Sequence, residues 1–119
     1  MTEKDQTGDE TSKAYLVELV SNRKIPISTP VCSVGRLDSN EIVIGDDKSI
    51  SKHHFTISME DSSYFVEDAN SSYGTFVNGE KIAEKTKVTD GDVIKAGNSM
   101  FWFTEGEREL KVSREMIKP

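Results

Sequence analysis

Three short polar clusters in this 119-residue sequence combine residue types that bind anions. They are Gly35-Arg36, Ser51-Lys52-His53-His54 and Ser71-Ser72-Tyr73-Gly74-Thr75-Phe76-Val77-Asn78-Gly79. Arginine offers a planar fork of N–H donors, lysine an ammonium group and serine a hydroxyl, and loop backbone N–H groups add further donors. Each cluster adjoins an apolar run, so each is expected at the end of a β-strand. If the loops converge, they predict a site for a phosphate or a carboxylate.

Taken singly, these residues also have ordinary structural explanations. Arg36 alone fits a solvated arginine at a strand end, and the polar segment 68–75 fits a turn. His54 alone fits a half-buried histidine that hydrogen-bonds to a loop backbone. The anion-binding interpretation therefore depends on the order and spacing of the clusters.

Catalysis and metal binding are disfavoured by the same residues. A triad can be named from Ser51, His54 and Asp68, but the sequence has neither a strained nucleophile turn nor an evident oxyanion hole. The glycines fit neither nucleotide-binding phosphate loop, and no carboxylate pair occupies an apolar setting. His53 and His54 point to opposite faces of a strand, and Cys32 is the only thiol. We expect a binding protein, with no enzymatic activity, cofactor or metal.

Composition narrows the class of partner and the compartment. The net charge of −6 argues against a nucleic-acid-binding surface, which needs an excess of Lys and Arg. No apolar run approaches the roughly 20 residues that a membrane helix needs, and residues 1–13 lack the apolar segment of a signal peptide. The lone Cys32 cannot form an internal disulfide, which favours a reducing compartment. These features predict a cytoplasmic protein without nucleic-acid or membrane partners.

Short β-like runs separated by turn residues predict an all-β sandwich. The segment 55–59 alternates apolar and polar residues, which places one face of a strand in a core. The regular spacing of runs and turns favours two packed sheets over alternating strands and helices. Before the first run, residues 1–13 have the composition of a disordered acidic tail. After the last run, residues 106–119 fit a linker or a short helix. The runs cover residues 15–20, 25–28, 31–36, 41–44, 54–59, 64–68, 75–77, 93–95 and 100–104.

The ordered set of clusters resembles the forkhead-associated (FHA) domain family. The shared pattern is GR, then SxxH after about fifteen residues, then GTxVNG after about twenty more, and here it begins at Gly35, Ser51 and Gly74. The resemblance covers roughly residues 14–104 and places the domain at 14–105. It implies a two-sheet antiparallel β-sandwich of about eleven strands that binds phosphothreonine peptides through loops at one end.

Roles within the site follow from the resemblance, position by position. The residues that it assigns to the phosphate are Arg36, Ser51, Lys52 and Ser72. Those that it assigns to the scaffold are Gly35, His54, Gly74 and Asn78. Tyr73 stands where the family often has an Asn that holds the peptide backbone, so only a hydroxyl or a ring surface is available here. Lys48 and Ser49 precede the motif serine, where they help to read the third residue after the phosphothreonine. Lys48 would favour an acidic residue there.

The resemblance implies a phosphothreonine-dependent interaction module that acts with a Ser/Thr protein kinase. Tyr73 supports an alternative, a module that no longer depends on phosphate. A second alternative is the sensory N-terminal domain of a larger signalling enzyme.

The acidic tail adds three possible phosphorylation sites, Thr2, Thr7 and Thr11, with an ordinary solubilising tail as the alternative. Thr11 lies four residues from Tyr15, a reach of about 13 Å. The binding loops are expected at the opposite end of the domain, so phosphorylated Thr11 is expected to engage another molecule and cause self-association.

Overall fold

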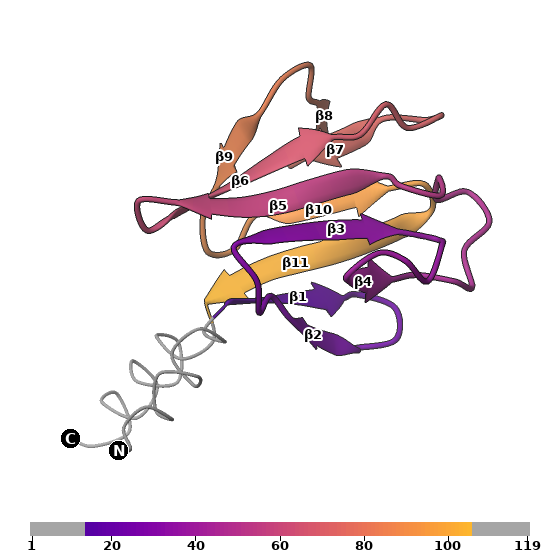
Figure 1. Ribbon diagram of the computed structural model, residues 1–119, viewed down its shortest axis with the longest axis horizontal. Helices are drawn as coiled ribbons and strands as arrows, with labels where there is room; N and C mark the ends of the chain where they lie inside the picture. The colour runs from indigo at the N-terminus through magenta and orange to yellow at the C-terminus, as the bar shows by residue number, and fades with distance from the viewer. Residues whose placement is uncertain (1–13, 106–119) are drawn as a thin grey trace.

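Alternation of buried and solvent-facing side chains builds the strands. The computed structural model describes residues 14–105, which form eleven strands in two sheets (Figure 1). In β5 (Phe55–Glu60), Phe55 and Ile57 are buried while Thr56 lies between them on the other face. The remaining strands are β1 (Ala14–Glu18), β2 (Lys24–Pro26), β3 (Val31–Gly35), β4 (Ile42–Val43), β6 (Ser63–Asp68), β7 (Thr75–Val77), β8 (Glu80–Lys81), β9 (Thr86–Val88), β10 (Val93–Ala96) and β11 (Ser99–Glu105).

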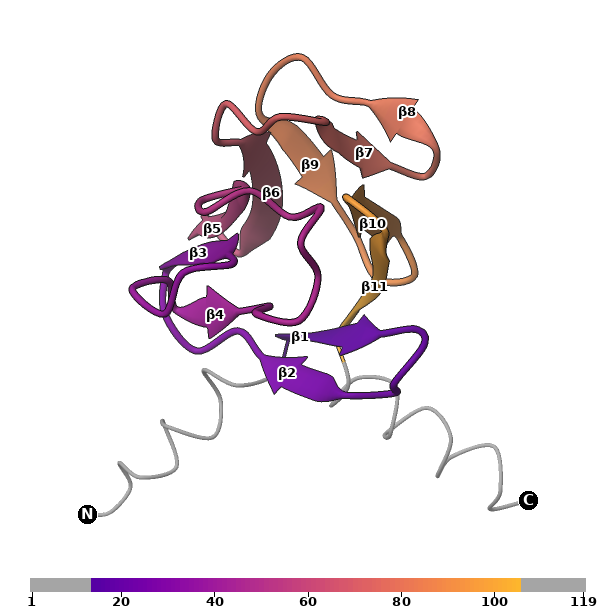
Figure 2. The same cartoon turned by 90° about the vertical axis from the view of Figure 1, so that its right-hand side faces the viewer.

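The two sheets pack as the layers of a sandwich, which confirms the expected fold. The six-stranded sheet has the order β2-β1-β11-β10-β7-β8, and the five-stranded sheet has the order β4-β3-β5-β6-β9. Figure 2 looks along the sandwich and shows the layers of β3, β5 and β6 and of β10 and β11 facing each other. One pairing is parallel, because Val34 of β3 lies opposite Ile42 of β4. The other pairings are antiparallel.

Strands β8 and β9 have no counterpart among the runs expected from the pattern. Each has only two or three residues, and neither contains enough apolar positions to show alternation. Their pairing is set by neighbours, because Lys81 lies opposite Phe76 and Lys87 lies opposite Phe65. Such short strands are specified by the sheet that they join.

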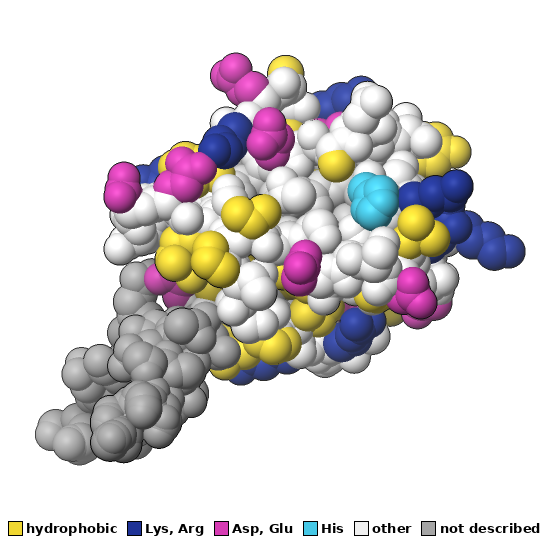
Figure 3. All heavy atoms as spheres, in the orientation of Figure 1, with side chains coloured by type: hydrophobic (Ala, Val, Ile, Leu, Met, Phe, Trp, Pro, Cys, Tyr) yellow, Lys and Arg dark blue, Asp and Glu magenta, His cyan; other side chains and the backbone are white. Residues whose placement is uncertain are grey.

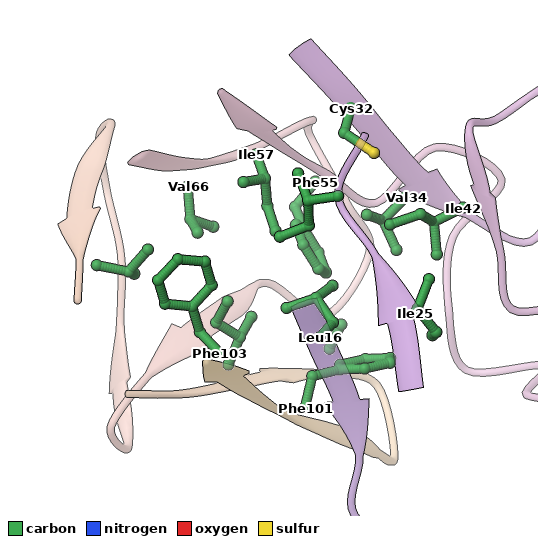
Figure 4. Packing of buried hydrophobic residues seen from close by; sticks show 14 of the residues in the cluster. Leu16, Ile25, Cys32, Val34, Ile42, Phe55, Ile57, Val66, Phe101 and Phe103 are labelled. Atoms are coloured by element: carbon green, nitrogen blue, oxygen red, sulfur yellow. The ribbon is translucent and has the colours of Figure 1, made fainter. Parts of the chain in front are cut away.

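A single hydrophobic core fills the space between the sheets (Figure 4). The Phe55 and Phe101 rings from opposite sheets meet edge to face at 6.4 Å between centroids. Tyr64 packs on Phe103 at 5.2 Å. Burying one large apolar side chain contributes about 1.5–3 kcal/mol, so this core supplies most of the favourable free energy of folding. It provides a rigid base for the loops at the strand ends.

The loops that carry the polar clusters lie at one end of the sandwich. In Figure 1, β3 and β6 both run toward the right-hand end, where the loops after β3, β4 and β6 gather. The start of β1 and the end of β11 lie at the other end, with Ala14 opposite Glu105. The described chain therefore enters and leaves the domain far from these loops.

Two expected segments, the acidic tail over 1–13 and the linker or helix over 106–119, lie outside the described residues. The possible phosphorylation sites Thr2, Thr7 and Thr11 belong to the first of them. Within residues 14–105, the structure contains no helix that is long and apolar enough to cross a membrane.

Candidate anion-binding site

Three loops meet at Ser51. They are the β3–β4 loop (36–41), the β4–β5 loop (44–54) and the β6–β7 loop (69–74). The Arg36 N–H donates to the Ser51 carbonyl oxygen at 3.1 Å, and the Ser72 N–H donates to Ser51 Oγ at 2.9 Å. The tertiary structure thus brings together the three polar clusters that are separate in the sequence.

Arg36 is half-buried, and one nitrogen of its guanidinium is hydrogen-bonded to the protein backbone. Its Nε donates to the Ile50 carbonyl oxygen at 3.0 Å. In the part of the chain that the structure describes, no acceptor is recorded for its two Nη groups. The fork of the guanidinium is therefore oriented and still able to donate two parallel hydrogen bonds, which is the geometry that a phosphate or carboxylate accepts.

Ser51 offers a hydroxyl proton beside this fork. Its Oγ already accepts the Ser72 N–H, and among residues 14–105 no acceptor is recorded for its own O–H. A hydroxyl supplies one donor and two acceptor sites, so this proton remains available for an anion. The side chains of Lys52, Ser72 and Tyr73 are exposed around it, and Tyr73 is 65% exposed.

His54 is fully buried and joins two of the loops. Its Nδ1 accepts the Ser51 N–H at 3.0 Å, so Nε2 carries the ring hydrogen and donates to the Gly74 carbonyl oxygen at 2.9 Å. The ring position is set by backbone partners on both sides. No triad is formed, because His54 bonds the Ser51 backbone and not its hydroxyl, while Asp68 bonds Ser71 and Thr75.

A close backbone approach at Gly35 brings the β3–β4 and β4–β5 loops together. A Cβ added at Gly35 would lie 2.2 Å from the Lys52 carbonyl oxygen, so only glycine fits without displacement. The same carbonyl accepts Asn40 Nδ2 at 2.8 Å, and this amide also donates to the Leu37 carbonyl oxygen at 2.7 Å. The Lys52 backbone is therefore fixed while its ammonium group stays exposed.

Asn40 is a positioning residue that the sequence pattern did not reveal. It is 6% exposed, and its Oδ1 bonds His53 Nδ1 at 3.0 Å in addition to the two carbonyl contacts of its amide nitrogen. In the sequence it sits in Asp38-Ser39-Asn40, which has the composition of an ordinary turn. The feature that distinguishes Asn40 is its burial two residues before β4, and burial becomes visible only in the folded structure.

The β6–β7 loop is shaped by the carboxylate of Asp68. It accepts the hydroxyls of Ser71 and Thr75, both at 2.6 Å, and the Ser71 N–H at 3.0 Å. Burial acts to raise the pKa of this carboxyl, but these hydrogen bonds outweigh it and hold the pKa below its ordinary value. Ser71 Oγ in turn accepts the Gly74 N–H at 2.9 Å, which closes the loop.

The β4–β5 loop is anchored by Asp47, beside the two residues expected to read the peptide. Asp47 accepts the N–H of Ser49 at 2.9 Å, the hydroxyl of Ser49, and the hydroxyl of Ser99 at 2.5 Å. Burial would raise the pKa of Asp47, but the serine donors keep it below its ordinary value. Ser49 Oγ also accepts the Asn98 N–H at 2.7 Å, so its hydroxyl is committed to internal bonds, while Lys48 is exposed.

Of the expected scaffold residues, Gly74 lies at the loops and Asn78 does not. Gly74 has φ of 91°, a left-handed conformation that favours glycine, and the stem of Lys81 lies against it. Asn78 lies at the other end of β7. Its side chain bonds Asp92 at 3.0 Å and the Val93 N–H at 3.0 Å, which ties the β7–β8 turn to the start of β10.

Basic side chains gather at the loop end of this protein, whose net charge is −6. Figure 3 shows Lys and Arg side chains gathered at this end, next to a histidine. The bases here include the exposed Lys48 and Lys52 and the half-buried Arg36, while Asp38 and Asp46 are exposed acids of the same loops. Donors and cations together make the loop junction suitable for a doubly charged anion.

Comparisons with known proteins match more than half of this chain. A family model described as FHA domain matches residues 32–97. The transcriptional regulatory protein EmbR of Mycobacterium tuberculosis is 34% identical over 90 residues, which cover 76% of this chain and 23% of EmbR. The FHA domain-containing protein FhaB of the same species is 29% identical over 80 residues, covering 67% of this chain and 51% of FhaB.

Solved structures show the same architecture. EmbR of M. tuberculosis in complex with a low-affinity phosphopeptide superposes with a TM-score of 0.74 at 34% identity, over 77% of this chain and 24% of that one. The FhaA FHA domain complexed with the intracellular domain of Rv3910 gives a TM-score of 0.70 at 25% identity, over 76% and 98%. The chain spans about a quarter of the length of EmbR and about half that of FhaB.

Proposed function

Because this chain belongs to the FHA domain family, we propose that it is a phosphothreonine-dependent protein-interaction module that acts with a Ser/Thr protein kinase. Its partner in this proposal is a phosphothreonine-containing protein or peptide, and it needs no cofactor and catalyses no reaction. We place the domain at residues 14–105, between the acidic tail and the C-terminal segment, in a cytoplasmic protein. Support comes from EmbR and FhaA, whose solved structures contain a phosphopeptide and a protein domain.

The observation that carries the proposal is the pairing of Arg36 with Ser51. Among residues 14–105, the Arg36 Nη groups and the Ser51 hydroxyl proton have no acceptor, and they lie on two loops that the hydrogen bond from the Arg36 N–H to the Ser51 carbonyl oxygen joins. A phosphothreonine carries close to two negative charges and three acceptor oxygens at neutral pH. Both groups bind phosphate oxygens in this proposal, with Lys52 and Ser72 completing the contacts. Charge-assisted bonds of this kind are about twice as strong as neutral ones.

The remaining peptide contacts fall to the exposed residues beside the phosphate. Tyr73 provides its hydroxyl or ring to the peptide backbone, and Lys48 with Ser49 reads the third residue after the phosphothreonine. Because the Ser49 hydroxyl is bonded within the protein, Lys48 carries the selectivity and favours an acidic residue. Few groups are involved, so we expect micromolar affinity, about −7 to −9 kcal/mol.

A phosphothreonine peptide library followed by calorimetric titration tests this function. The best peptide is expected to bind at micromolar Kd, and its unphosphorylated and phosphoserine forms at least tenfold more weakly. Arg36→Ala is expected to abolish binding and Arg36→Lys to weaken it, because lysine cannot donate the parallel pair of bonds. Thermal unfolding of each variant checks that the fold is retained. Unchanged affinity in a folded Arg36→Ala protein would remove the site assignment.

A second candidate function is a module that binds its partner without phosphate. It is favoured by Tyr73, which replaces the expected amide with a largely exposed ring. Equal binding of phosphorylated and plain peptides in the titration would select it. The domain also suits a sensory role in a larger signalling enzyme, since EmbR and FhaB are longer than their matched regions.

Self-association through the acidic tail completes the proposal. The described chain starts at the end opposite the loops, and Thr11 is only about 13 Å of chain from Tyr15. Phosphorylated Thr11 would therefore reach the loops of a second molecule, while Thr2, with about 43 Å of extended chain, has the longest reach of the three threonines. Light scattering on tail-phosphorylated protein tests this, and a strictly monomeric species with occupied loops contradicts it.

A further inference from the structure

The outer face of the six-stranded sheet is apolar although it points away from the core. Alternation sends Leu16 and Phe101 inward and their strand neighbours outward. Among these, Met100 and Trp102 are 40% and 36% exposed. The register places Val17, Trp102 and Val93 side by side across three strands. The apolar side chains at outward positions are Tyr15, Val17, Pro26, Phe76, Val93, Met100 and Trp102.

The charges on this outer face all have one sign. Its remaining outward strand positions are Thr104 and three lysines, and none of the outward positions within these six strands is acidic. Lys24 Nζ lies 4.2 Å from the centre of the Tyr15 ring, and Lys95 Nζ lies 5.5 Å from that of Phe76. The third is Lys81, opposite Phe76. A face with cations over aromatic rings, on a protein of net charge −6, complements an acidic surface.

Charge and composition argue against the three occupants that this chain could supply itself. A second copy would bring lysines against lysines in a face-to-face dimer, which is unfavourable. The segment 1–13 is acidic, with four acids and two lysines, but Met1 is its only large apolar residue. The segment 106–119 has apolar residues, but its bases outnumber its acids. Neither segment matches both properties of the face.

The outer face is continuous with the loops of the candidate site. Lys81 packs its stem on Gly74, whose carbonyl oxygen bonds His54. The turn between β10 and β11 also touches the β4–β5 loop, because a Cβ added at Gly97 would lie 2.4 Å from Ser49 Oγ. A partner protein bound at the loops therefore lies beside the outer face and can contact it as well. Simultaneous contact of one partner with the loops and the outer face rests on the proposed function, whereas the apolar and basic character of the face does not.

We propose that the outer face of the six-stranded sheet is a second docking surface, which binds an acidic and apolar surface of a partner protein independently of phosphate. The partner's carboxylates meet Lys24, Lys81 and Lys95, and its apolar side chains pack on the stripe centred on Trp102.

Trp102 provides a direct probe, since it is the single tryptophan of the sequence. A display library of random, unphosphorylated 16-residue peptides is selected against the whole chain, and enriched peptides are synthesised and titrated while Trp102 fluorescence is recorded. The enriched peptides are expected to have an excess of acids and at least two large apolar residues. They should shift the Trp102 emission saturably at micromolar concentration.

Matched variants separate this surface from general charge effects and from the loops. Lys24→Glu/Lys95→Glu is expected to weaken the enriched peptides at least tenfold while leaving phosphothreonine-peptide affinity within twofold. Lys87→Glu makes the same kind of charge change on an exposed residue of the five-stranded sheet and should change neither. Arg36→Ala should remove phosphopeptide binding only, so a failure of the proposed function is distinguishable.

Several results would overturn the docking surface. One is a selection in which no peptide binds the unchanged protein better than the Lys24→Glu/Lys95→Glu variant. Others are the enrichment of basic peptides, and a loss of affinity in Lys87→Glu that equals the loss in the double variant. A Trp102 shift with anionic phosphatidylglycerol vesicles but not with peptides would assign the face to a membrane. A concentration-dependent dimer in sedimentation, abolished by the double variant, would assign it to a second copy.

Discussion

Ser51 Oγ accepts the backbone N–H of Ser72 at 2.9 Å, across 21 residues of sequence. The hydroxyl that is expected to bind phosphate therefore also sets the position of the β6–β7 loop. Its oxygen accepts a hydrogen bond within the protein, while its proton has no acceptor in the described part of the chain and can be donated to a ligand. The same hydroxyl group thus joins two loops and provides the proposed phosphate contact. Substitutions of Ser51 should therefore affect both stability and binding.

Replacing Ser51 with alanine is expected to weaken phosphopeptide binding at least tenfold and to lower the free energy of unfolding by about 0.5–1.5 kcal/mol. The stability cost is small because Ser72 is exposed and water can accept its N–H. Calorimetric titration and urea unfolding measure the two effects. Ser51→Thr keeps the hydroxyl and should retain most of the binding. Normal binding by a folded Ser51→Ala protein would contradict the assigned role.

Gly35→Ala is expected to destabilise the domain by about 2 kcal/mol or more and to reduce phosphopeptide affinity, because the added methyl would lie 2.2 Å from the Lys52 carbonyl oxygen. Gly45→Ala is the matched control, since its Cβ meets nothing closer than 3.9 Å. Thermal unfolding of both variants measures the difference. Equal melting temperatures would show that the approach of the two loops is adjustable.

His54→Phe is expected to lower the free energy of unfolding by about 2–4 kcal/mol. A ring of similar size fills the space but leaves the Ser51 N–H and the Gly74 carbonyl without their buried partner. His53→Phe, at the exposed neighbouring position, removes a single hydrogen bond to Asn40 Oδ1 and should cost only about 0.5–1.5 kcal/mol. Urea unfolding compares the two, and a similar loss at both positions would argue against a special role for His54.

Asn40→Asp is expected to destabilise the loops by about 1–3 kcal/mol and to weaken phosphopeptide binding, although the side chain keeps its shape. The amide nitrogen that donates to the Leu37 and Lys52 carbonyls becomes an oxygen that repels them. Asn98→Asp makes the same change at an exposed turn position. Hydrogen exchange of residues 36–54 should rise in the first variant only, and protection equal to that of the unchanged protein would contradict this role.

Asp68→Asn is expected to cost about 1–2 kcal/mol of stability at neutral pH, and the difference should shrink in acid. The pKa of Asp68 is lowered in the folded state, because its hydrogen bonds outweigh the opposing effect of burial. The contribution of the carboxylate is therefore complete above its unfolded pKa of about 3.9 and is lost as pH falls through the lower folded pKa. Urea unfolding from pH 7 to pH 3 measures it, with Asp46→Asn as an exposed control. A difference that grows toward low pH would reverse the assigned sign.

The strands with clear alternation were predictable from the sequence. Segment 55–59 alternates because one face of β5 meets the core, and this pattern is local. Strands β8 and β9 were not predicted, since two or three residues carry no period and their pairing depends on β7 and β6. The parallel pairing of β3 with β4 was missed as well, because the register depends on the path of the β3–β4 loop through space.

The sequence by itself determined the chemical groups of the candidate site and their order along the chain. Arg36, Ser51 and Ser72 were identifiable because residue type and spacing are properties of the chain. Only the tertiary structure decided which atoms of these residues are already committed and which remain for a ligand. That division comes from contacts such as Arg36 Nε to Ile50 and Asn40 to Lys52, made between residues 12 or more positions apart. The apolar outer face around Trp102 arises in the same way, because it forms only when strands distant in sequence lie side by side.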